Sequence, residues 1–277
     1  MMREEFTPEQ ENQCRRLESE VAILTNRFAA YFERYVYLSR QVERWLRHDY
    51  MTLIGEHELR LYEQTAETKR LQRYIDEART YVERGLPVDC AAIERKLERE
   101  FQTLESEVEE KRDKVEQVRE VVATREPMSD KQAATFKEDF RFITRHVHPA
   151  IVDDFDEEKQ WALNQAIYAF TVGSFRLMHT LRLYWERQAE EPVPEEDFDT
   201  LVEDLRDRRE RLHMGIFEYR AKMGELKHEF PFNQQRLLTD KEAVKARVTG
   251  ILEETEKWRL LEKVLRGSLE MLIQREA

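Results

Sequence analysis

Apolar residues recur at alternating intervals of four and three near the N-terminus, and this pattern constrains the fold more than any other feature. The spacing continues without a gap through Leu17, Val21, Leu24, Phe28, Tyr31, Tyr35, Leu38, Val42 and Trp45. A repeat of about 3.5 residues keeps one stripe of a helix facing a partner helix, as in a coiled coil. We therefore predict a long helix that begins at the capping sequence Thr7-Pro8-Glu9-Gln10 and has a kink or a break near Gly55.

The same spacing returns in two later parts of the chain. One follows the turn at 85–88, where Asp89 is expected to cap a helix. The other runs from Phe198 to Leu272, with a reversal at 231–233 and a capping box at 239–242. Because the reversal separates two apolar stripes of similar length, we predict an antiparallel helical hairpin over 195–276. The first arm is expected to cover residues 7–126.

The composition agrees with long helices and excludes several classes of protein. Only seven of the 277 residues are glycine and seven are proline, so neither an all-β fold nor a Gly-rich nucleotide-binding fold is expected. Charged residues make up 38% of the chain, and the net charge of −12 argues against a nucleic-acid partner. No apolar run reaches the roughly 18 residues of a membrane span, and no secretory signal follows the first five residues. Cys14 and Cys90 have no metal or redox spacing, which indicates free thiols and a cytoplasmic protein.

Residues 128–190 differ from the heptad segments because their apolar residues are aromatic and clustered. The aromatic set is Phe136, Phe140, Phe142, Trp161, Tyr168, Phe170, Phe175 and Trp185. We expect a small helical domain here, with one helix from about Lys131 to Val147 and a second from about Glu157. The loop between them begins His148-Pro149-Ala150.

This domain resembles the second and third helices of a J-domain, the module with which co-chaperones engage seventy-kilodalton heat-shock chaperones. His148-Pro149 match the first two residues of the family's His-Pro-Asp signature, and Ile143 and Val147 match apolar positions before it. The sequence Leu163-Asn164-Gln165-Ala166-Ile167 resembles a second signature, with Ile167 in place of Tyr. The resemblance covers about 50 of the 277 residues.

The third signature position departs from the family, because Ala150 stands where the family has Asp. The resemblance implies that this Asp is needed to stimulate the chaperone's ATPase. Asp153 and Asp154 follow closely, but they could replace it only in a rearranged loop. We therefore expect the fold to be J-like and the co-chaperone activity to be lost.

Three basic residues are spaced by four on the helix before the loop: Lys137, Arg141 and Arg145. This spacing places them on one helix face. The resemblance implies that such a face docks an acidic chaperone. The alternative is a solvated face with local pairs to Glu138 or Asp139.

The sequence as a whole predicts an all-α protein, in which long antiparallel coiled-coil-like helices flank a small J-like domain. The leading hypothesis is a non-enzymatic interaction or scaffold protein without metal or cofactor. Its expected partners are other proteins, a heat-shock chaperone among them, or a second copy through coiled coils. Alternatives are a working co-chaperone and, third, a metal-dependent enzyme at His146, His148 and the acidic loop. The candidate partner-binding residues are His148, Pro149, Lys137, Arg141 and Arg145.

Overall fold

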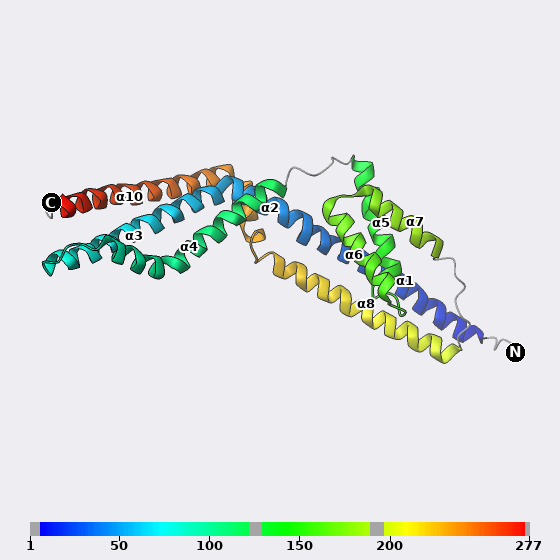
Figure 1. Ribbon diagram of the computed structural model, residues 1–277. Coiled ribbons are helices and arrows are strands. Elements are labelled where there is room, and N and C mark those ends of the chain that lie inside the picture. The colour runs from blue at the N-terminus through cyan, green and yellow to red at the C-terminus, as the bar shows by residue number, and fades with distance from the viewer. Residues whose placement is uncertain (1–5, 122–128, 189–196, 275–277) are drawn as a thin grey trace. The chain divides into compact units, whose positions relative to one another are not determined.

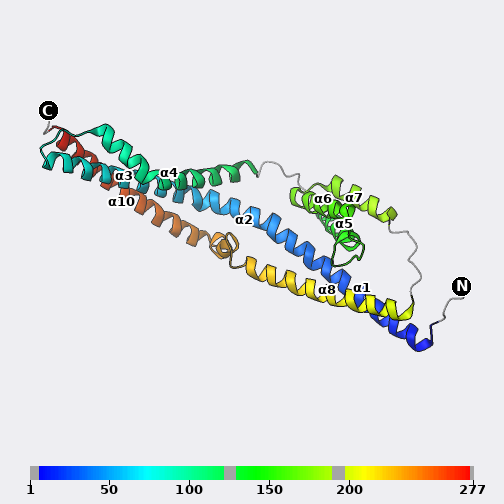
Figure 2. The ribbon, with the colours of Figure 1, turned by 60° about the horizontal axis from the view of Figure 1, so that its bottom comes forward.

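The computed structural model describes residues 6–121, 129–188 and 197–274, which are largely helical (Figures 1 and 2). No strand occurs among the described residues, so the predicted all-α fold is confirmed. Contacts divide the chain into two compact units, Met1–Trp45 with Thr124–Asn233 and Leu46–Ala123 with Gln234–Ala277. This division differs from the three consecutive domains expected from the sequence. The expected domain ends at 126, 128, 190, 195 and 276 lie outside the described residues.

The first unit begins with helix α1 (Pro8–Val36), which starts where the sequence predicted. The Thr7 hydroxyl accepts from the Gln10 backbone N–H at 3.3 Å, and the Gln10 side chain accepts from the Thr7 N–H at 2.9 Å. This capping box satisfies two backbone donors that a helix start otherwise leaves unpaired. The predicted seam is buried at its N-terminal end, in Leu17, Val21, Leu24 and Phe28.

The seam shifts where α1 gives way to the π-helical segment η1 (Tyr37–Val42), which leads into α2 (Glu43–Tyr50). A π turn holds more residues than an α turn, so it rotates the following side chains around the helix axis. Gln41 is consequently buried, and its amide donates to the Phe170 carbonyl at 2.6 Å. Trp45, which the heptad pattern placed on the seam, is exposed.

Helix α8 (Phe198–Leu226) runs parallel to α1, and the two lie side by side in Figures 1 and 2. The Phe6 and Phe198 rings are 5.6 Å apart, Arg209 pairs with Glu20 at 3.2 Å, and the Tyr219 and Tyr35 rings are 5.3 Å apart. From the first of these three contacts to the last, the residue numbers increase on both sides of the pairing. The pairing is therefore with α1 and parallel, in place of the expected antiparallel partner at 240–275.

The small helical domain consists of α5 (Asp130–Val147), α6 (Glu157–Val172) and α7 (Phe175–Gln188). Ser129 forms a capping box with Gln132 at the start of α5, and Asp156 caps α6 through the Lys159 N–H at 2.8 Å. Gly173 ends α6 with a φ of 75°, a left-handed conformation that favours glycine. The core is aromatic, with Phe170 packed against Phe136 and Phe140 at 5.3 and 4.5 Å between ring centroids.

The second unit is built on α3 (Glu56–Glu83), which follows the π-helical segment η2 (Met51–Gly55). The chain remains helical at Gly55, so the predicted break is wrong, but the regular α-helix gives way to a π-helical segment at this point. A turn at 84–88 leads to α4 (Cys90–Val121), which Asp89 caps through the Ala92 N–H as predicted. Arg73 pairs with Glu100 and Lys96 pairs with Glu77, so α3 and α4 form an antiparallel hairpin.

Helix α10 (Lys241–Gln274) packs on α3, and it follows the short helices η4 (Phe232–Gln234) and α9 (Gln235–Thr239). Arg247 pairs with Glu58 at 2.7 Å, and the Thr68 hydroxyl lies 3.4 Å from the Trp258 carbonyl, so α10 and α3 are parallel. Asp240 caps α10 in place of the expected Thr239. The predicted hairpin over 195–276 is wrong as a description of the pairing, because α8 packs on α1 and α10 on α3. A heptad stripe indicates that a helix packs against another helix, but it does not identify that helix.

Candidate interaction site

The His-Pro-Ala loop continues directly from α5 and is closed by its own hydrogen bonds. His148 is the C-cap of α5, and its ring Nδ1 accepts from the Ala150 N–H at 3.1 Å. The His148 carbonyl also accepts from the N–H groups of Ile151 and Val152, at 2.8 and 3.0 Å. Pro149 is exposed at the tip of this turn. The loop is therefore an ordered turn that the His148 side chain holds.

The His148 ring lies inside an aromatic cluster. Only 8% of His148 is exposed. Its ring centroid is 4.7 Å from Phe28 and 4.8 Å from Phe32, both of α1, and its Nε2 lies 3.4 Å from the Tyr219 hydroxyl of α8. Burial lowers the pKa of His148 to about 4, because the charged ring would lose its hydration. The same cause raises the pKa of Tyr219 to about 12.

The acidic part of the loop does not supply the carboxylate that Ala150 lacks. Asp153 pairs with Arg208 and Arg211 of α8. Burial alone would raise the Asp153 pKa, but the two guanidinium groups outweigh it and the pKa is lowered. Asp154 pairs with Lys159 at 2.6 Å. Both carboxylates thus fasten the loop within the first unit.

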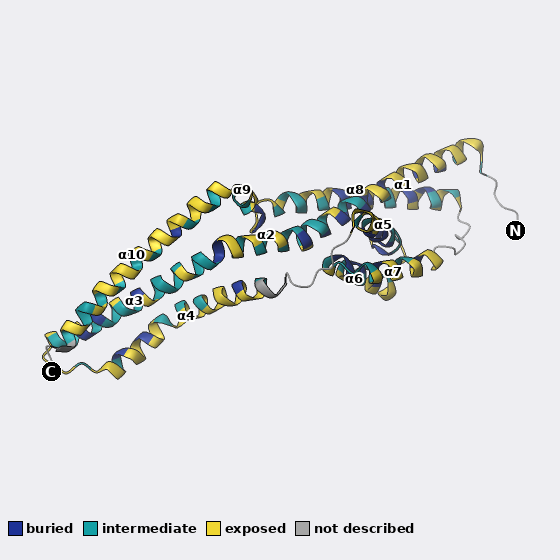
Figure 3. Ribbon diagram, turned by 90° about the horizontal axis from the view of Figure 1, so that it is seen from above, coloured by how far each residue is buried: buried dark blue, intermediate teal, exposed yellow. Residues whose placement is uncertain are grey.

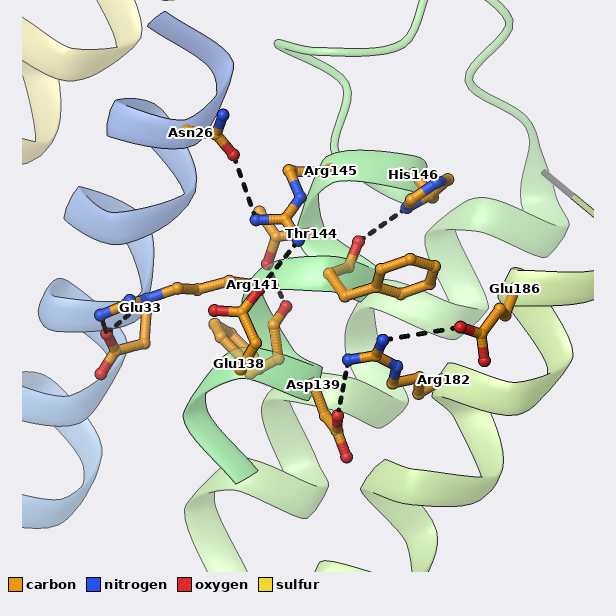
Figure 4. Close-up of polar contacts among 12 residues, drawn as sticks. Asn26, Glu33, Glu138, Asp139, Arg141, Thr144, Arg145, His146, Arg182 and Glu186 are labelled. Atoms are coloured by element: carbon orange, nitrogen blue, oxygen red, sulfur yellow. Dashed lines mark hydrogen bonds and ion pairs between the residues drawn. The ribbon is translucent and has the colours of Figure 1, made fainter. Parts of the chain in front are cut away.

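Two of the three basic residues of α5, Arg141 and Arg145, contact α1 (Figure 4), and Lys137 contacts Tyr37 of the adjoining η1. The Arg141 guanidinium donates to one oxygen of Glu33 at 2.6 and 3.1 Å, and only 6% of the Glu33 side chain is exposed. Arg145 donates to Asn26 of α1 at 3.2 Å and to Glu138 of its own helix at 3.0 Å. The Lys137 ammonium lies 5.0 Å from the centre of the Tyr37 ring. The pair between Arg145 and Glu138 is a local pair of the kind expected for a solvated face, whereas the contact of Arg141 with Glu33 was not expected. The docking role of this face stays a prediction.

The opposite side of α5 carries the buried carboxylate of Asp139, which the sequence analysis considered only as a local partner of the basic residues. Asp139 is almost fully buried and accepts from Arg182 of α7 at 3.0 Å (Figure 4). His179 Nδ1 lies 3.4 Å from the other oxygen of the same carboxylate. The Arg182 guanidinium also lies 4.6 Å from the centre of the Phe142 ring. Both faces of α5 are therefore tied to neighbouring helices through ion pairs.

The two histidines proposed as a metal pair engage different groups. His146 Nδ1 lies 2.8 Å from the Phe142 carbonyl, whereas both ring nitrogens of His148 lie near Ala150 and Tyr219. Across residues 6–121, 129–188 and 197–274, no three His, Cys, Asp or Glu side chains gather as metal ligands would. The sequence-based metal site is therefore not assembled by these residues.

The outer surface of α6 exposes large aromatic side chains that the sequence analysis assigned to the domain's cluster. Trp161 is 56% exposed and Tyr168 is 57% exposed, with Val172 on the same side one turn further on. We call these three residues the α6 aromatic face. The buried residues of α6 are mostly alanines, Ala162, Ala166 and Ala169. This alanine stripe was the available signal, since it marks the packed side of the helix and leaves Trp161 and Tyr168 opposite.

Comparison with known proteins found no matching family model, no matching curated protein and no matching solved structure. Within the described ranges, no helix is both long enough and apolar enough to cross a membrane.

Proposed function

We propose that this chain is a non-enzymatic, cytoplasmic protein-interaction or scaffold protein. Its J-like loop then has a structural role, which is to hold neighbouring helices together. The observation that carries the proposal is the burial of His148 between α1 and α8. A signature residue that is 8% exposed, and bonded at both ring nitrogens, has no surface to offer a chaperone. The loop instead fastens the small helical domain to α1 and α8.

The α6 aromatic face is the proposed surface for partners. Tryptophan and tyrosine are the residues most enriched where protein interfaces gain their affinity. Here both project from one helix, with Tyr184 of α7 also exposed and bonded to Glu158 at the start of α6. An interaction protein explains why these side chains are not packed into the adjoining core.

The competing function is a working J-domain co-chaperone, which would dock the chaperone through Lys137, Arg141 and Arg145. That function would require Arg141 to leave Glu33, and it would leave a nearly buried carboxylate unpaired. It would also require a substitute for the Asp that Ala150 replaces. For these two reasons the co-chaperone activity is the second candidate function.

An ATPase assay separates the two functions. The purified full chain is added to a seventy-kilodalton heat-shock chaperone, with an authentic J-domain protein as the positive control. We expect no stimulation at concentrations at which the control is saturating. Stimulation by this chain that a His148→Gln substitution abolishes would overturn the proposal.

A second experiment tests the interaction surface itself. Proteins captured by the tagged chain are compared with those captured by the Trp161→Ala/Tyr168→Ala variant. Gln160→Ala is the matched control, because Gln160 is exposed on the same helix next to Trp161. We expect the double substitution to remove specific partners that the control retains. An identical set of partners for all three proteins would contradict the role of the α6 aromatic face.

A further inference from the structure

Helix α10 carries two apolar stripes, of which one is used within the second unit. The first stripe contains Ile251, which is buried, and Trp258 and Leu265, which are partly buried against α3. The second stripe lies on the other side of the helix and is uncovered. Leu260 is 55% exposed, Val264 is 65% exposed and Met271 is 63% exposed. In Figure 3, much of α10 is coloured as exposed.

The second stripe has the spacing of a helix-pairing seam. Its positions are Leu260, Val264, Gly267 and Met271, which are separated by four, three and four residues. Side chains at these intervals fall on one line along a helix, where they meet another helix. An isolated surface leucine would not show this regularity.

Gly267 leaves the backbone open in the middle of this stripe. A Cβ atom added there would meet no heavy atom of the described chain within 4 Å, as is also true at Gly224 and Gly250. Because glycine has no side chain, a second helix can approach the backbone closely at this position. A helix that crosses close to the backbone at this point would use the missing side chain.

We propose that the stripe Leu260, Val264, Gly267 and Met271 pairs with the same stripe of a second copy, in an antiparallel arrangement about a twofold axis. An axis between Leu265 and Arg266 places Val264 opposite Gly267 of the second copy, and Leu260 opposite Met271. A large residue then always faces a small or a flexible one. A parallel pairing would set Gly267 against Gly267 and leave a gap at the centre of the seam.

The charges beside the stripe fit the antiparallel arrangement. Lys263 and Glu270 each precede a stripe residue and lie on the same flank. Both are exposed, and no ion pair joins either to another described residue. The twofold axis brings Lys263 of one copy within about one helical turn of Glu270 of the other, on both sides of the axis. Opposite charges therefore meet twice, and no like charges do.

This pairing goes beyond the proposed function and does not depend on it. The stripe lies in the second unit, whereas the α6 aromatic face and the His-Pro loop lie in the first. A chain that failed to pair through α10 would still be able to bind partners through Trp161. A chain without such partners would still be able to dimerise.

Sedimentation of the full chain over a range of concentrations tests the pairing. The interface is short, and interfaces at the small end of the range give weak complexes. We therefore expect a reversible change from the 33.6 kDa monomer to twice that mass at micromolar concentrations. Val264→Glu should abolish the dimer while circular dichroism is unchanged, because Val264 contributes nothing to the packing on α3. Leu252→Glu is the matched control, since Leu252 is exposed on another line of the same helix.

Charge exchange and cross-linking test the antiparallel arrangement. Lys263→Glu should weaken the dimer at least several-fold, and adding Glu270→Lys should restore it. In a Cys90→Ser background, a mixture of Leu260→Cys and Met271→Cys chains should form a disulfide-linked dimer, while either chain alone should not. A monomer at every concentration, a dimer that survives Val264→Glu, or cross-linking of Leu260→Cys chains alone would each overturn the proposal.

Discussion

His148 Nε2 lies 3.4 Å from the hydroxyl oxygen of Tyr219, a residue 71 positions further along the chain. Nδ1 of the same ring accepts from the Ala150 N–H, so the proton of the neutral ring is on Nε2 and points to Tyr219. The imidazole thus joins the end of α5, its own loop and α8. A protonated ring would carry a charge between Phe28 and Phe32, where water is excluded.

Stability should therefore fall as this ring becomes protonated. The pKa of His148 is lowered from 6.5 to about 4 by burial, so the unfolded chain binds the proton more readily than the folded chain. The stabilising contribution is complete above about pH 6.5 and is lost as the pH falls toward 4. Its full size is roughly 3 kcal/mol in the free energy of unfolding.

Denaturant unfolding between pH 4 and 7 measures this effect, with His148→Phe as the comparison. Phenylalanine fills the aromatic cluster but does not titrate, so the variant's stability should depend less on pH. The difference between the two proteins should grow in favour of the variant as the pH falls. Parallel pH profiles for the two proteins would show that His148 is not the titrating group.

Gly215 of α8 is expected to be intolerant of a side chain. A Cβ atom there would lie 3.0 Å from Phe28 Cδ2 and closer still to Cε2, and Phe28 is fully buried. Gly215→Ala should therefore lower the free energy of unfolding by about 1–3 kcal/mol, as overpacking does. Thermal unfolding measured by circular dichroism should give a lower midpoint.

Gly224 of the same helix is the matched control for this prediction. A Cβ atom added there would meet no heavy atom within 4 Å, so Gly224→Ala should change only the helix propensity. We expect it to raise the stability by up to about 1 kcal/mol. Equal effects of the two substitutions would show that α8 does not approach Phe28 at Gly215.

Local features of this fold were predictable from the sequence, whereas the pairing of its helices was not. Thr7, Gln10 and Asp89 act within one helical turn, so their capping roles follow from neighbouring residues alone. The heptad stripe from Leu17 to Phe28 likewise predicts burial. Direction and partner depend on residues far away: both Glu20–Arg209 and Glu58–Arg247 join positions 189 apart. Nothing in a single stripe encodes that separation.

The surroundings of the candidate site residues were not predictable for the same reason. The spacing of Lys137, Arg141 and Arg145 placed them on one face, and they do share one. The partner of Arg141 on that face is Glu33, which lies 108 residues earlier in the chain. The burial of His148 depends equally on Phe28 and Tyr219. Motif resemblance described the loop's local sequence but not the helices packed over it.

Removal of Arg141 should be costly, because its partner cannot regain water. The Glu33 side chain is 6% exposed and accepts two hydrogen bonds from the guanidinium. Arg141→Met should lower the free energy of unfolding by about 2–3 kcal/mol, since it leaves a buried carboxylate unpaired. Adding Glu33→Gln should recover part of that loss, as denaturant titration of the four proteins in the cycle would measure.

An exposed pair on α1 provides the control for that cycle. Arg15 and Glu11 form an ion pair at 3.0 Å, with at least half of each side chain exposed. Arg15→Met should cost less than about 0.5 kcal/mol, because solvent screens such pairs. If Arg141→Met were equally mild, Arg141 would not be anchoring α5 to α1.

The parallel direction of α1 and α8 predicts which labelled positions lie close together. With Glu20 beside Arg209, Arg15 of α1 lies near the level of Asp204 of α8. Glu225 is 21 residues further along α8, which is about 30 Å at 1.5 Å per residue. Spin labels at 15 and 204 should therefore give a short distance, and labels at 15 and 225 a much longer one.

The labels would be attached to introduced cysteines in a Cys90→Ser background, since Cys14 is buried. An antiparallel pair of these two 29-residue helices, aligned end to end, would place Arg15 near the level of Tyr219, so the order of the two distances would be reversed.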